Sequence, residues 1–212
     1  MGISMKVTLY GASGMIGSRI LNELVLRQHQ VIAVARDPSK IARTGVDVRA
    51  GDVLDSHSVA DTARGTDAVI SAYAPPEDAT RLLADATRSL LSALEQTGVR
   101  RFLMVGGAGN LEVAPGVPIV DTPHFPQEWI SHGLAHKDAL SILKQSDLDW
   151  TSLSPAALIQ PGERTGVFRL SGNTFMPSPD GQSSISAEDF SVALVDELEH
   201  PRHVRQVLGV VY

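Results

Sequence analysis

The sequence predicts an α/β fold with a doubly wound, mostly parallel sheet and helices on both faces. Three observations lead to this fold class. A short apolar strand at 6–10 runs into a glycine-rich turn, apolar residues at helical spacing begin inside that turn, and a second apolar strand follows at 30–35. Strand, turn, helix and strand in this order form the first unit of an open parallel sheet. With 212 residues, we expect one domain spanning 1–212.

The first turn carries three glycines, Gly11, Gly14 and Gly17, directly after the strand. In dinucleotide-binding turns, one glycine allows the tight turn, one lets backbone amides approach a pyrophosphate, and one lets the helix pack closely on the strand. The helix N-terminus adds unpaired N–H groups and a partial positive charge, and Ser13 adds a hydroxyl. Because a strand precedes the glycines and a helix follows, the motif favours nucleotide binding over an ordinary turn.

The second strand ends where such folds select their cofactor. An acidic residue there binds the ribose 2′-hydroxyl of NAD, whereas arginine pairs with the 2′-phosphate of NADP. Ala35 stands where the acid is expected and Arg36 comes next, while Asp37 is better explained as a turn residue. The pattern favours NADP(H), with NAD(H) as the alternative.

The alternation of strands and helices continues through the middle of the chain. We expect strands at 46–53, 66–76 (running into a proline-rich turn) and 101–105, and helices at 58–64 and 77–97. Asp55 or Ser56 can cap the first of these helices, and Gly98 can end the second.

Candidate cofactor contacts lie at the carboxyl ends of these strands, where ligands bind in open α/β sheets. Asp52 can accept a hydrogen bond from an adenine amine, although an Asx turn explains it equally well. Tyr73 is expected to face the cofactor. A second glycine cluster begins at Gly106 and Gly107, and its small residues would let a flat nicotinamide ring lie on the backbone.

Residues 111–126 form a proline-rich segment of a length typical of lids and substrate walls. His124 and Phe125 lie in it and can touch a planar substrate. Together with a small appendage at 156–185, this segment is expected to form the substrate side.

A helix is expected at 127–145. It carries His132 and His136 four residues apart and therefore on one face, followed by Lys137. Gly133 rather than glutamate follows His132, so the His-Glu-x-x-His zinc pattern is absent and we predict no metal site.

The last third of the chain completes the sheet. We expect strands at 148–155, 167–170 and 206–212, a loop at 175–182, and a helix with Ser186 as its cap and an apolar stripe from Phe190 to Leu198.

Composition narrows the function classes. The net charge of −6 and the pI near 5.6 disfavour a nucleic-acid or anionic-membrane surface. Cysteine is absent, which excludes disulfides and thiolate catalysis. No apolar run approaches the ~20 residues that a membrane helix needs, and no signal-peptide pattern precedes the first strand. We therefore expect a cytoplasmic protein, monomeric or homodimeric, whose partner is a small molecule.

Several motifs in fixed order resemble the atypical short-chain dehydrogenase/reductases with an NAD(P)H-binding domain. The closest resemblance is to the NADH-flavin reductase branch, related to biliverdin IXβ (flavin) reductase. The motifs that carry it lie at 11–17, 35–38, 51–53, 106–109, 149–151, 154–156, 161–166 and 184–190.

This resemblance implies a Rossmann-like fold and hydride transfer from reduced nicotinamide to a flavin or similar acceptor. It also implies roles for particular residues. The phosphates would lie on Gly11, Ser13, Gly14, Met15, Ile16 and Gly17, the 2′-phosphate on Arg36, the adenine on Asp52 and Val53, and the ribose and nicotinamide on Ala72, Tyr73, Gly106 and Gly107.

The chain departs from the wider superfamily in its catalytic residues. The usual Tyr-x-x-x-Lys pair lets tyrosine act as general acid or base, but Gly133 stands four residues before Lys137. The fifth strand is followed by glycine rather than the catalytic serine. Reduction of a flavin or quinone needs mainly two rings held face to face, which fits a site without the dyad.

The expected function is therefore NADPH-dependent reduction of a flat conjugated acceptor such as a flavin or quinone. One alternative is a non-enzymatic NADP(H)-binding redox sensor that resembles the NmrA-like regulators. Another is a carbonyl reductase or epimerase-type enzyme with His124, His136 or Lys137 as its acid.

Overall fold

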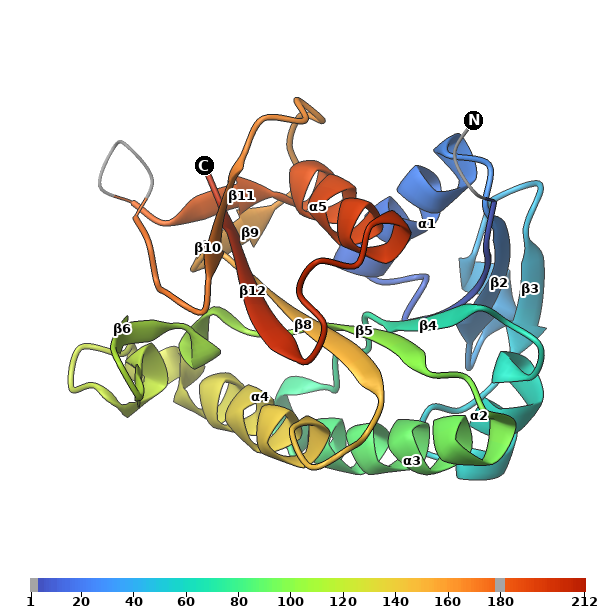
Figure 1. The fold of residues 1–212 in the computed structure, drawn as a ribbon, viewed down its shortest axis with the longest axis horizontal. Coiled ribbons are helices and arrows are strands. Elements are labelled where there is room, and N and C mark those ends of the chain that lie inside the picture. The colour runs from blue at the N-terminus through green and yellow to red at the C-terminus, as the bar shows by residue number, and fades with distance from the viewer. Residues whose placement is uncertain (1–3, 178–181) are drawn as a thin grey trace.

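The computed structural model describes residues 4–177 and 182–212, and its centre is an eight-stranded sheet in the order β10-β12-β8-β5-β4-β1-β2-β3 (Figure 1). All neighbouring strands are parallel except β10, which runs antiparallel to β12. The strands are β1 (Lys6–Tyr10), β2 (Gln30–Ala35), β3 (Asp47–Ala50), β4 (Ala68–Ser71), β5 (Arg101–Val105), β8 (Asp149–Pro155), β10 (Arg169–Gly172) and β12 (Gln206–Val211).

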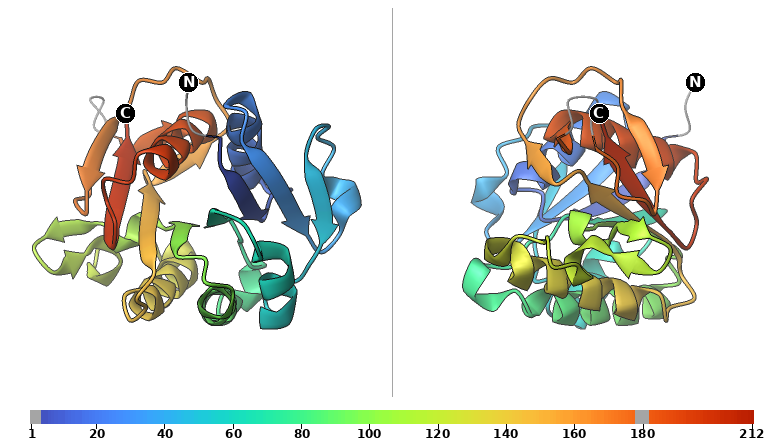
Figure 2. Two further views of the ribbon diagram at one scale, coloured as in Figure 1. Left: turned by 45° about the vertical axis from the view of Figure 1, so that its right-hand side comes forward. Right: turned by 90° about the vertical axis from the view of Figure 1, so that its left-hand side faces the viewer.

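Helices cover both faces of the sheet, which confirms the doubly wound α/β class. Figures 1 and 2 show α1 and α5 on one face and α2, α3 and α4 on the other. The helices are α1 (Met15–Leu26), α2 (Ser56–Ala63), α3 (Leu82–Thr97), α4 (Ile130–Leu143) and α5 (Ala187–Glu199). Because both faces are covered, the central strands are buried along most of their length, and Leu9 of β1 is aligned with Ala33 and Ile70 of its neighbours.

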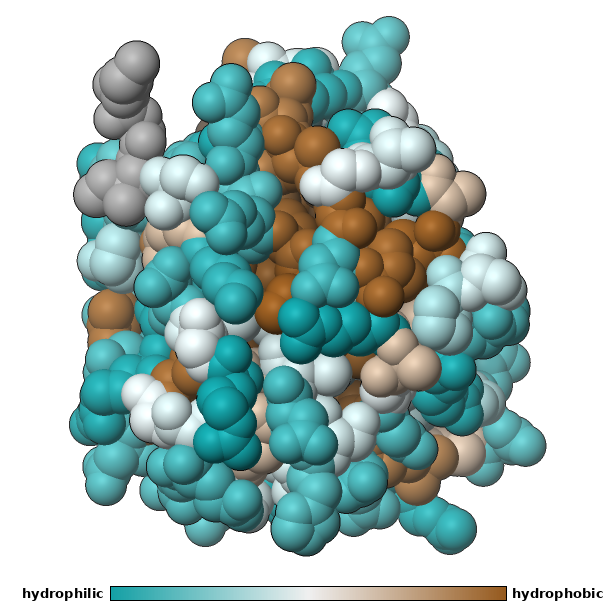
Figure 3. All heavy atoms as spheres, turned by 90° about the vertical axis from the view of Figure 1, so that its right-hand side faces the viewer, coloured by the Kyte–Doolittle hydropathy of each residue, from teal (hydrophilic) through white to brown (hydrophobic). Residues whose placement is uncertain are grey.

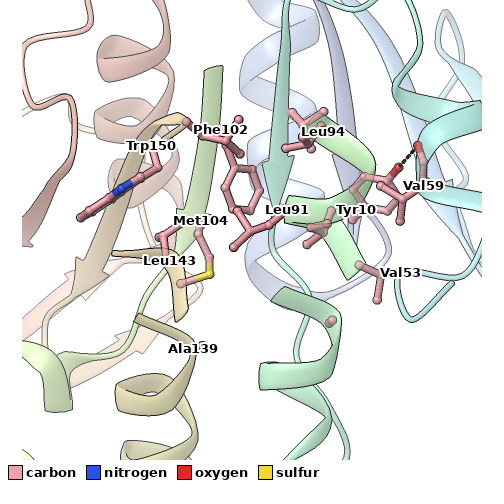
Figure 4. Packing of buried hydrophobic residues seen from close by; sticks show 14 of the residues in the cluster. Tyr10, Val53, Val59, Leu91, Leu94, Phe102, Met104, Ala139, Leu143 and Trp150 are labelled. Carbon is pink, nitrogen blue, oxygen red and sulfur yellow. Dashed lines mark hydrogen bonds between the residues drawn. The ribbon is translucent and has the colours of Figure 1, made fainter. Parts of the chain in front are cut away.

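The core on the α2–α4 side is drawn in Figure 4, where side chains from β1, β5 and β8 meet the helices. Phe102 is fully buried at its centre, and Tyr10 is 2% exposed. The Tyr10 hydroxyl lies 2.5 Å from Thr62 Oγ1 and donates to the Val59 carbonyl at 3.2 Å. Burial raises the pKa of Tyr10 to about 12, so the hydroxyl keeps its proton as an interior hydrogen-bonding group.

A charge network around the buried Glu23 lies in the opposite layer, that of α1 and α5. Arg27 on α1 forms ion pairs of 2.7 Å with Glu23, Asp196 and Glu199, of which the last two lie on α5. Glu23 also pairs with Arg164 at 2.7 Å, and this bond lowers the pKa of the Glu23 carboxyl. The network fixes α1 to α5 and holds the segment around Arg164 against α1.

Several predicted elements have the observed bounds or nearly so. β2 and β5 match the predicted strands, Asp55 caps α2 by accepting from the His57 amide, and Ser186 caps α5 by accepting from the Asp189 amide. Gly98 ends α3 in the left-handed conformation, at φ 73°.

Other expectations were wrong in detail. α3 begins at Leu82 rather than at 77, because residues Glu77–Ala79 form a separate 3₁₀ turn (η2) before it. The segment 111–126 is not one irregular loop but contains a hairpin of β6 (Glu112–Ala114) and β7 (Val117–Pro118).

The predicted appendage is also more ordered than expected. Besides β10, it contains β9 (Leu158–Gln160), which pairs in parallel with β11 (Ser184–Ser186). Of the loop predicted at 175–182, residues 178–181 lie outside the described residues. α4 is shorter than the predicted helix at 127–145, since a 3₁₀ turn (η5, Gln127–Trp129) precedes it.

Figure 3 shows the side of the molecule where the sheet ends in β2 and the edge strand β3. Most of this face is hydrophilic, and hydrophobic residues gather in one area of its upper half. Across the part of the chain that the structure describes, every helix is too short or too polar to cross a membrane.

Two glycines bring α1 against the ends of the strands. An added Cβ at Gly17 would lie 2.0 Å from the Gly11 carbonyl oxygen, whereas one at Gly14 would lie 3.3 Å from the same atom. Gly11 has φ 76°, and its own added Cβ would lie 2.4 Å from the Ala72 carbonyl oxygen. The closest approach of helix to strand therefore depends on the missing side chain of Gly17.

We expect Gly17→Ala to lower the free energy of unfolding by about 1–3 kcal/mol, even though alanine favours helix, because the backbone must move apart. Gly14→Ala is the matched control and should lower the free energy of unfolding by less, since its added Cβ would lie 3.3 Å from the Gly11 carbonyl oxygen. Urea unfolding of both variants measures the difference. A Gly17→Ala protein as stable as the parent would contradict the packing role.

Candidate functional site

A continuous cleft crosses the carboxyl ends of the central strands. A small cavity of about 180 Å³ lies over β1, β2 and β3, and a large cavity of about 880 Å³ lies toward β5, β8 and α4. The two cavities share Gly14, Ala72, Tyr73 and Ala74. The sheet order reverses between β1 and β4, so the cleft lies at the topological switch point where α/β sheets bind ligands.

The glycine turn forms the junction of the two cavities. The Gly14 amide donates to the Gly11 carbonyl at 3.0 Å, which closes the turn. α1 then begins at Met15 without any side-chain cap, so its first N–H groups face the cleft unpaired by a side chain. Ser13, Met15 and Ile16 line the cleft as well. This arrangement is suited to hold a phosphate by backbone N–H groups and the helix dipole.

Gly17 has a different position from the other glycines. It lines neither cavity, is buried in α1, and faces the backbone of Gly11. Its place matches the close helix–strand packing expected of one glycine in the motif. Its assignment to the phosphate group came from the family resemblance, and the geometry offers no contact between Gly17 and the cleft.

The small cavity gathers the residues predicted for the adenosine end, Arg36, Asp52 and Val53. Tyr73, which was predicted for the ribose and nicotinamide, lines this cavity as well as the large one. Asp52 Oδ1 accepts from the Leu54 amide at 3.0 Å, so the Asx turn is present and the carboxylate lines the cavity too. Burial raises the pKa of Tyr73, and the charges of Arg36 and Asp52 act on it in opposite directions. Both charged side chains therefore lie within electrostatic reach of this ring.

Arg36 and Asp37 have the roles in the turn that the sequence indicated. Asp37 Oδ1 accepts from the Ser39 amide at 3.1 Å and from its hydroxyl at 2.6 Å, so this carboxylate is used within the turn. Arg36 is exposed, and no ion pair to it is found among the described residues. Among the described residues, the cavity thus has a free cation and no acidic side chain at the end of β2.

Gly106 and Gly107 line the large cavity, as expected for a wall made of backbone. An added Cβ at Gly107 would lie 2.8 Å from the His136 ring, so this ring packs directly on the glycine. An added Cβ at Gly106 would lie 2.7 Å from Ser152 Oγ and 2.9 Å from Ser154 Oγ. Both positions need the absence of a side chain to bring backbone and polar groups together.

Aromatic and aliphatic side chains form much of the rest of the large cavity. Phe125 lines it as predicted and packs on Gly133, while Trp129, 46% exposed, stands at its edge. The sequence did not single out Trp129, His132 and Pro155 as wall residues, whereas Ala157, Ile159 and Phe175 belong to the appendage at 156–185 that was expected on the substrate side. For Pro155 and Ala157 the signal was their place after a strand, at the same edge of the sheet as the glycine clusters.

The three catalytic candidates named from the sequence separate in the structure. Only His136 lines the cleft; His124 and Lys137 line neither cavity. Lys137 Nζ is held by both oxygens of Asp121 at 2.6 and 2.7 Å. Because Lys137 is held in this ion pair and lies outside both cavities, its ammonium group is not placed to donate a proton to a ligand in the cleft.

His136 has an unusual environment for an imidazole. Its Nδ1 atom is buried and has no hydrogen-bond partner among the residues that the structure describes. Burial, with a smaller contribution from the nearby His132, lowers the pKa of His136 to about 4. The ring is therefore uncharged at neutral pH and remains so well into the acidic range.

The sheet order, the glycine turn and the cleft define a Rossmann-like protein of the nicotinamide-dinucleotide-binding class. Comparison with known proteins gives the family. The model of the NAD(P)H-binding family matches residues 11–201, and the chain belongs to this oxidoreductase-type family. The nicotinamide cofactor predicted from the sequence is thereby confirmed at the level of NAD(P)H.

Relatives resemble the chain along nearly its whole length. YwnB of Bacillus subtilis (strain 168), an uncharacterized protein, is 37% identical over 211 residues, 98% of each chain. The crystal structure of a "putative exported protein" from Burkholderia pseudomallei is 44% identical at a TM-score of 0.91, covering 98% of this chain and 100% of that one. A "putative NADH-flavin reductase" from Streptococcus pneumoniae TIGR4 is 32% identical at a TM-score of 0.87, covering 98% and 99%.

The buried imidazole predicts a pH dependence of stability. In the unfolded chain His136 takes up a proton near pH 6.5, but in the folded protein only near pH 4. Its contribution to the free energy of unfolding is therefore complete above about pH 6.5 and is lost as pH falls toward 4. When the pH falls from 7 to 5, we expect the free energy of unfolding of His136→Phe to drop by about 2 kcal/mol less than that of the parent.

Urea unfolding at the two pH values measures this difference. Carboxylates titrate mostly below this window, and the other histidines are common to both proteins, so the comparison isolates His136. Equal losses in the two proteins would show that the ring is not kept neutral by the fold.

Proposed function

We propose that the protein is an NADPH-dependent reductase of a flat conjugated acceptor, such as a flavin or quinone. The observation that carries the proposal is the cleft, in which a phosphate-binding turn opens directly into a large cavity with aromatic walls. The volume of about 880 Å³ accommodates a nicotinamide ring and an acceptor ring together. The name of the pneumococcal relative, an NADH-flavin reductase, is in keeping with this class of acceptor.

The residues of the cleft fit a nicotinamide dinucleotide. The uncapped N-terminus of α1 and Ser13 would hold the pyrophosphate, and Asp52 with Val53 the adenine. Ala72 and Tyr73 lie between the two cavities, where the ribose of the nicotinamide would pass. When bound, the reduced cofactor supplies a hydride from C4 of its nicotinamide ring.

The protein's own contribution is positioning and exclusion of water. The bare backbone at Gly106 and Gly107 offers a flat surface for a ring, and Phe125, Trp129 and Phe175 surround the space beside it. Holding two rings at a fixed distance and orientation lowers the entropic cost of hydride transfer and supplies much of the rate enhancement in such reactions.

Arg36 supports a preference for NADPH over NADH. Its guanidinium is unpaired among the described residues and lines the small cavity, and Ala35 offers no carboxylate to a 2′-hydroxyl. Asp37 accepts its hydrogen bonds from Ser39, and among the described residues it forms no ion pair with Arg36 that would occupy the guanidinium. The 2′-phosphate and the guanidinium would form charge-assisted hydrogen bonds.

We expect Arg36→Ala to raise the Kd for NADPH about 10- to 100-fold, because the charge-assisted hydrogen bonds to the 2′-phosphate are lost. The Kd for NADH should change by less than about threefold. Arg64→Ala removes the same charge at the C-terminal end of α2, where the side chain lines neither cavity, and is the control. Nicotinamide fluorescence measures both affinities. An equal loss for the two cofactors would refute the 2′-phosphate assignment.

The function itself is tested by NADPH oxidation, followed at the nicotinamide absorbance band with FMN, riboflavin and a quinone as acceptors. The proposal expects turnover with at least one of them, and a comparison with NADH reports the cofactor preference in the same assay. Tight binding of NADPH without turnover on any acceptor would refute the reductase and favour a redox sensor.

A further inference from the structure

The large cavity contains two imidazoles on one face of α4. His132 and His136 are one helical turn apart, and both line the cavity that also contains Gly106 and Gly107. Their spacing equals that of the Tyr-x-x-x-Lys pair that the chain lacks. The remaining titratable side chains lining this cavity are Tyr73, at its junction with the small cavity, and Glu77, which is exposed.

His136 can offer only one kind of hydrogen bond to a ligand. A neutral imidazole carries a single N–H, and an N–H on the enclosed Nδ1 would be a buried donor without an acceptor. The proton therefore belongs on Nε2, for which no bond to a described residue is found. The ring is held by contact with Gly107, and Asn110 Nδ2 donates to the His136 carbonyl at 3.1 Å.

His132 is half-buried, as His136 is. It lies one turn nearer the N-terminus of α4, in the same cavity wall as the exposed Trp129. A histidine in this position can lose a proton to a bound molecule and regain one from water. The pair thus combines a fixed neutral donor with a group that exchanges protons.

We propose that His136 is a catalytic hydrogen-bond donor to a carbonyl oxygen of the acceptor and that His132 supplies the proton, which makes quinone-type carbonyl compounds the substrate class. The inference rests on the proposed reductase function. The hydride of NADPH forms a new bond to the acceptor, an electron pair of its conjugated system moves to the oxygen, and His132 transfers a proton to that oxygen. NADPH becomes NADP⁺, and His132 is reprotonated by water.

Three variants test the two roles with 1,4-naphthoquinone as acceptor. His136→Phe keeps the ring and removes the donor, and should lower kcat about 100- to 1,000-fold. His136→Gln places an amide N–H near the position of Nε2 and should recover at least tenfold of that loss. His132→Ala should lower kcat about 100-fold, and added imidazole should restore at least tenfold, which a purely structural loss would not allow.

Two controls separate a change in chemistry from a change in folding. His57→Ala removes an exposed histidine on α2 that lines neither cavity and should leave kcat unchanged. NADPH affinity, measured by fluorescence, should stay within about threefold of the parent in all four variants. Unchanged turnover in both His136→Phe and His132→Ala would overturn the inference and leave the reductase function standing.

A binding measurement keeps the inference testable if no acceptor is turned over. With NADP⁺ present, quenching of tryptophan fluorescence reports the affinity for 1,4-naphthoquinone and for naphthalene, which lacks the oxygens. We expect His136→Phe to weaken the binding of naphthoquinone at least tenfold and the binding of naphthalene by less than threefold. Such a result without turnover would refute the reductase but retain the donor role, and equal effects on the two ligands would overturn the donor role.

Discussion

The close approach of three backbone segments is the constraint on which the rest of the structure depends. Gly17 of α1 lies on the Gly11 carbonyl, and Gly11 lies on the Ala72 carbonyl after β4, so helix and two strand ends meet at distances that no side chain permits. This contact places the uncapped N-terminus of α1 at the point where the sheet order reverses. A phosphate site and the junction of the two cavities follow from the same geometry.

Glycines also allow close packing at the other end of the cleft. Gly107 admits the His136 ring and Gly133 admits Phe125, so in each case an aromatic side chain lies where a Cβ would stand. These contacts bring α4 and the segment 111–126 close to the end of β5. The cavity between them combines apolar walls with uncharged imidazole nitrogen, a combination suited to a flat, carbonyl-bearing molecule more than to a charged one.

Much of the fold could be predicted because its signals are local. The strand at 30–35, the caps at Asp55 and Ser186 and the helix end at Gly98 each depend on a few adjacent residues, and each is observed. The start of α3 and the β6–β7 hairpin could not be predicted as well. There, short stretches rich in proline and glycine permit several conformations, and the surrounding tertiary contacts select one.

By itself, the sequence determined the doubly wound class, the glycine turn and the nicotinamide cofactor, because periodicity and turn chemistry act over a few residues. Only the tertiary structure decided which candidates meet. It placed His136 in the cleft beside His132 and left Lys137 on Asp121, although Lys137 is adjacent to His136 in sequence. Adjacent residues on a helix point about 100° apart, so the packing of α4 on the sheet determines which of them reaches a ligand.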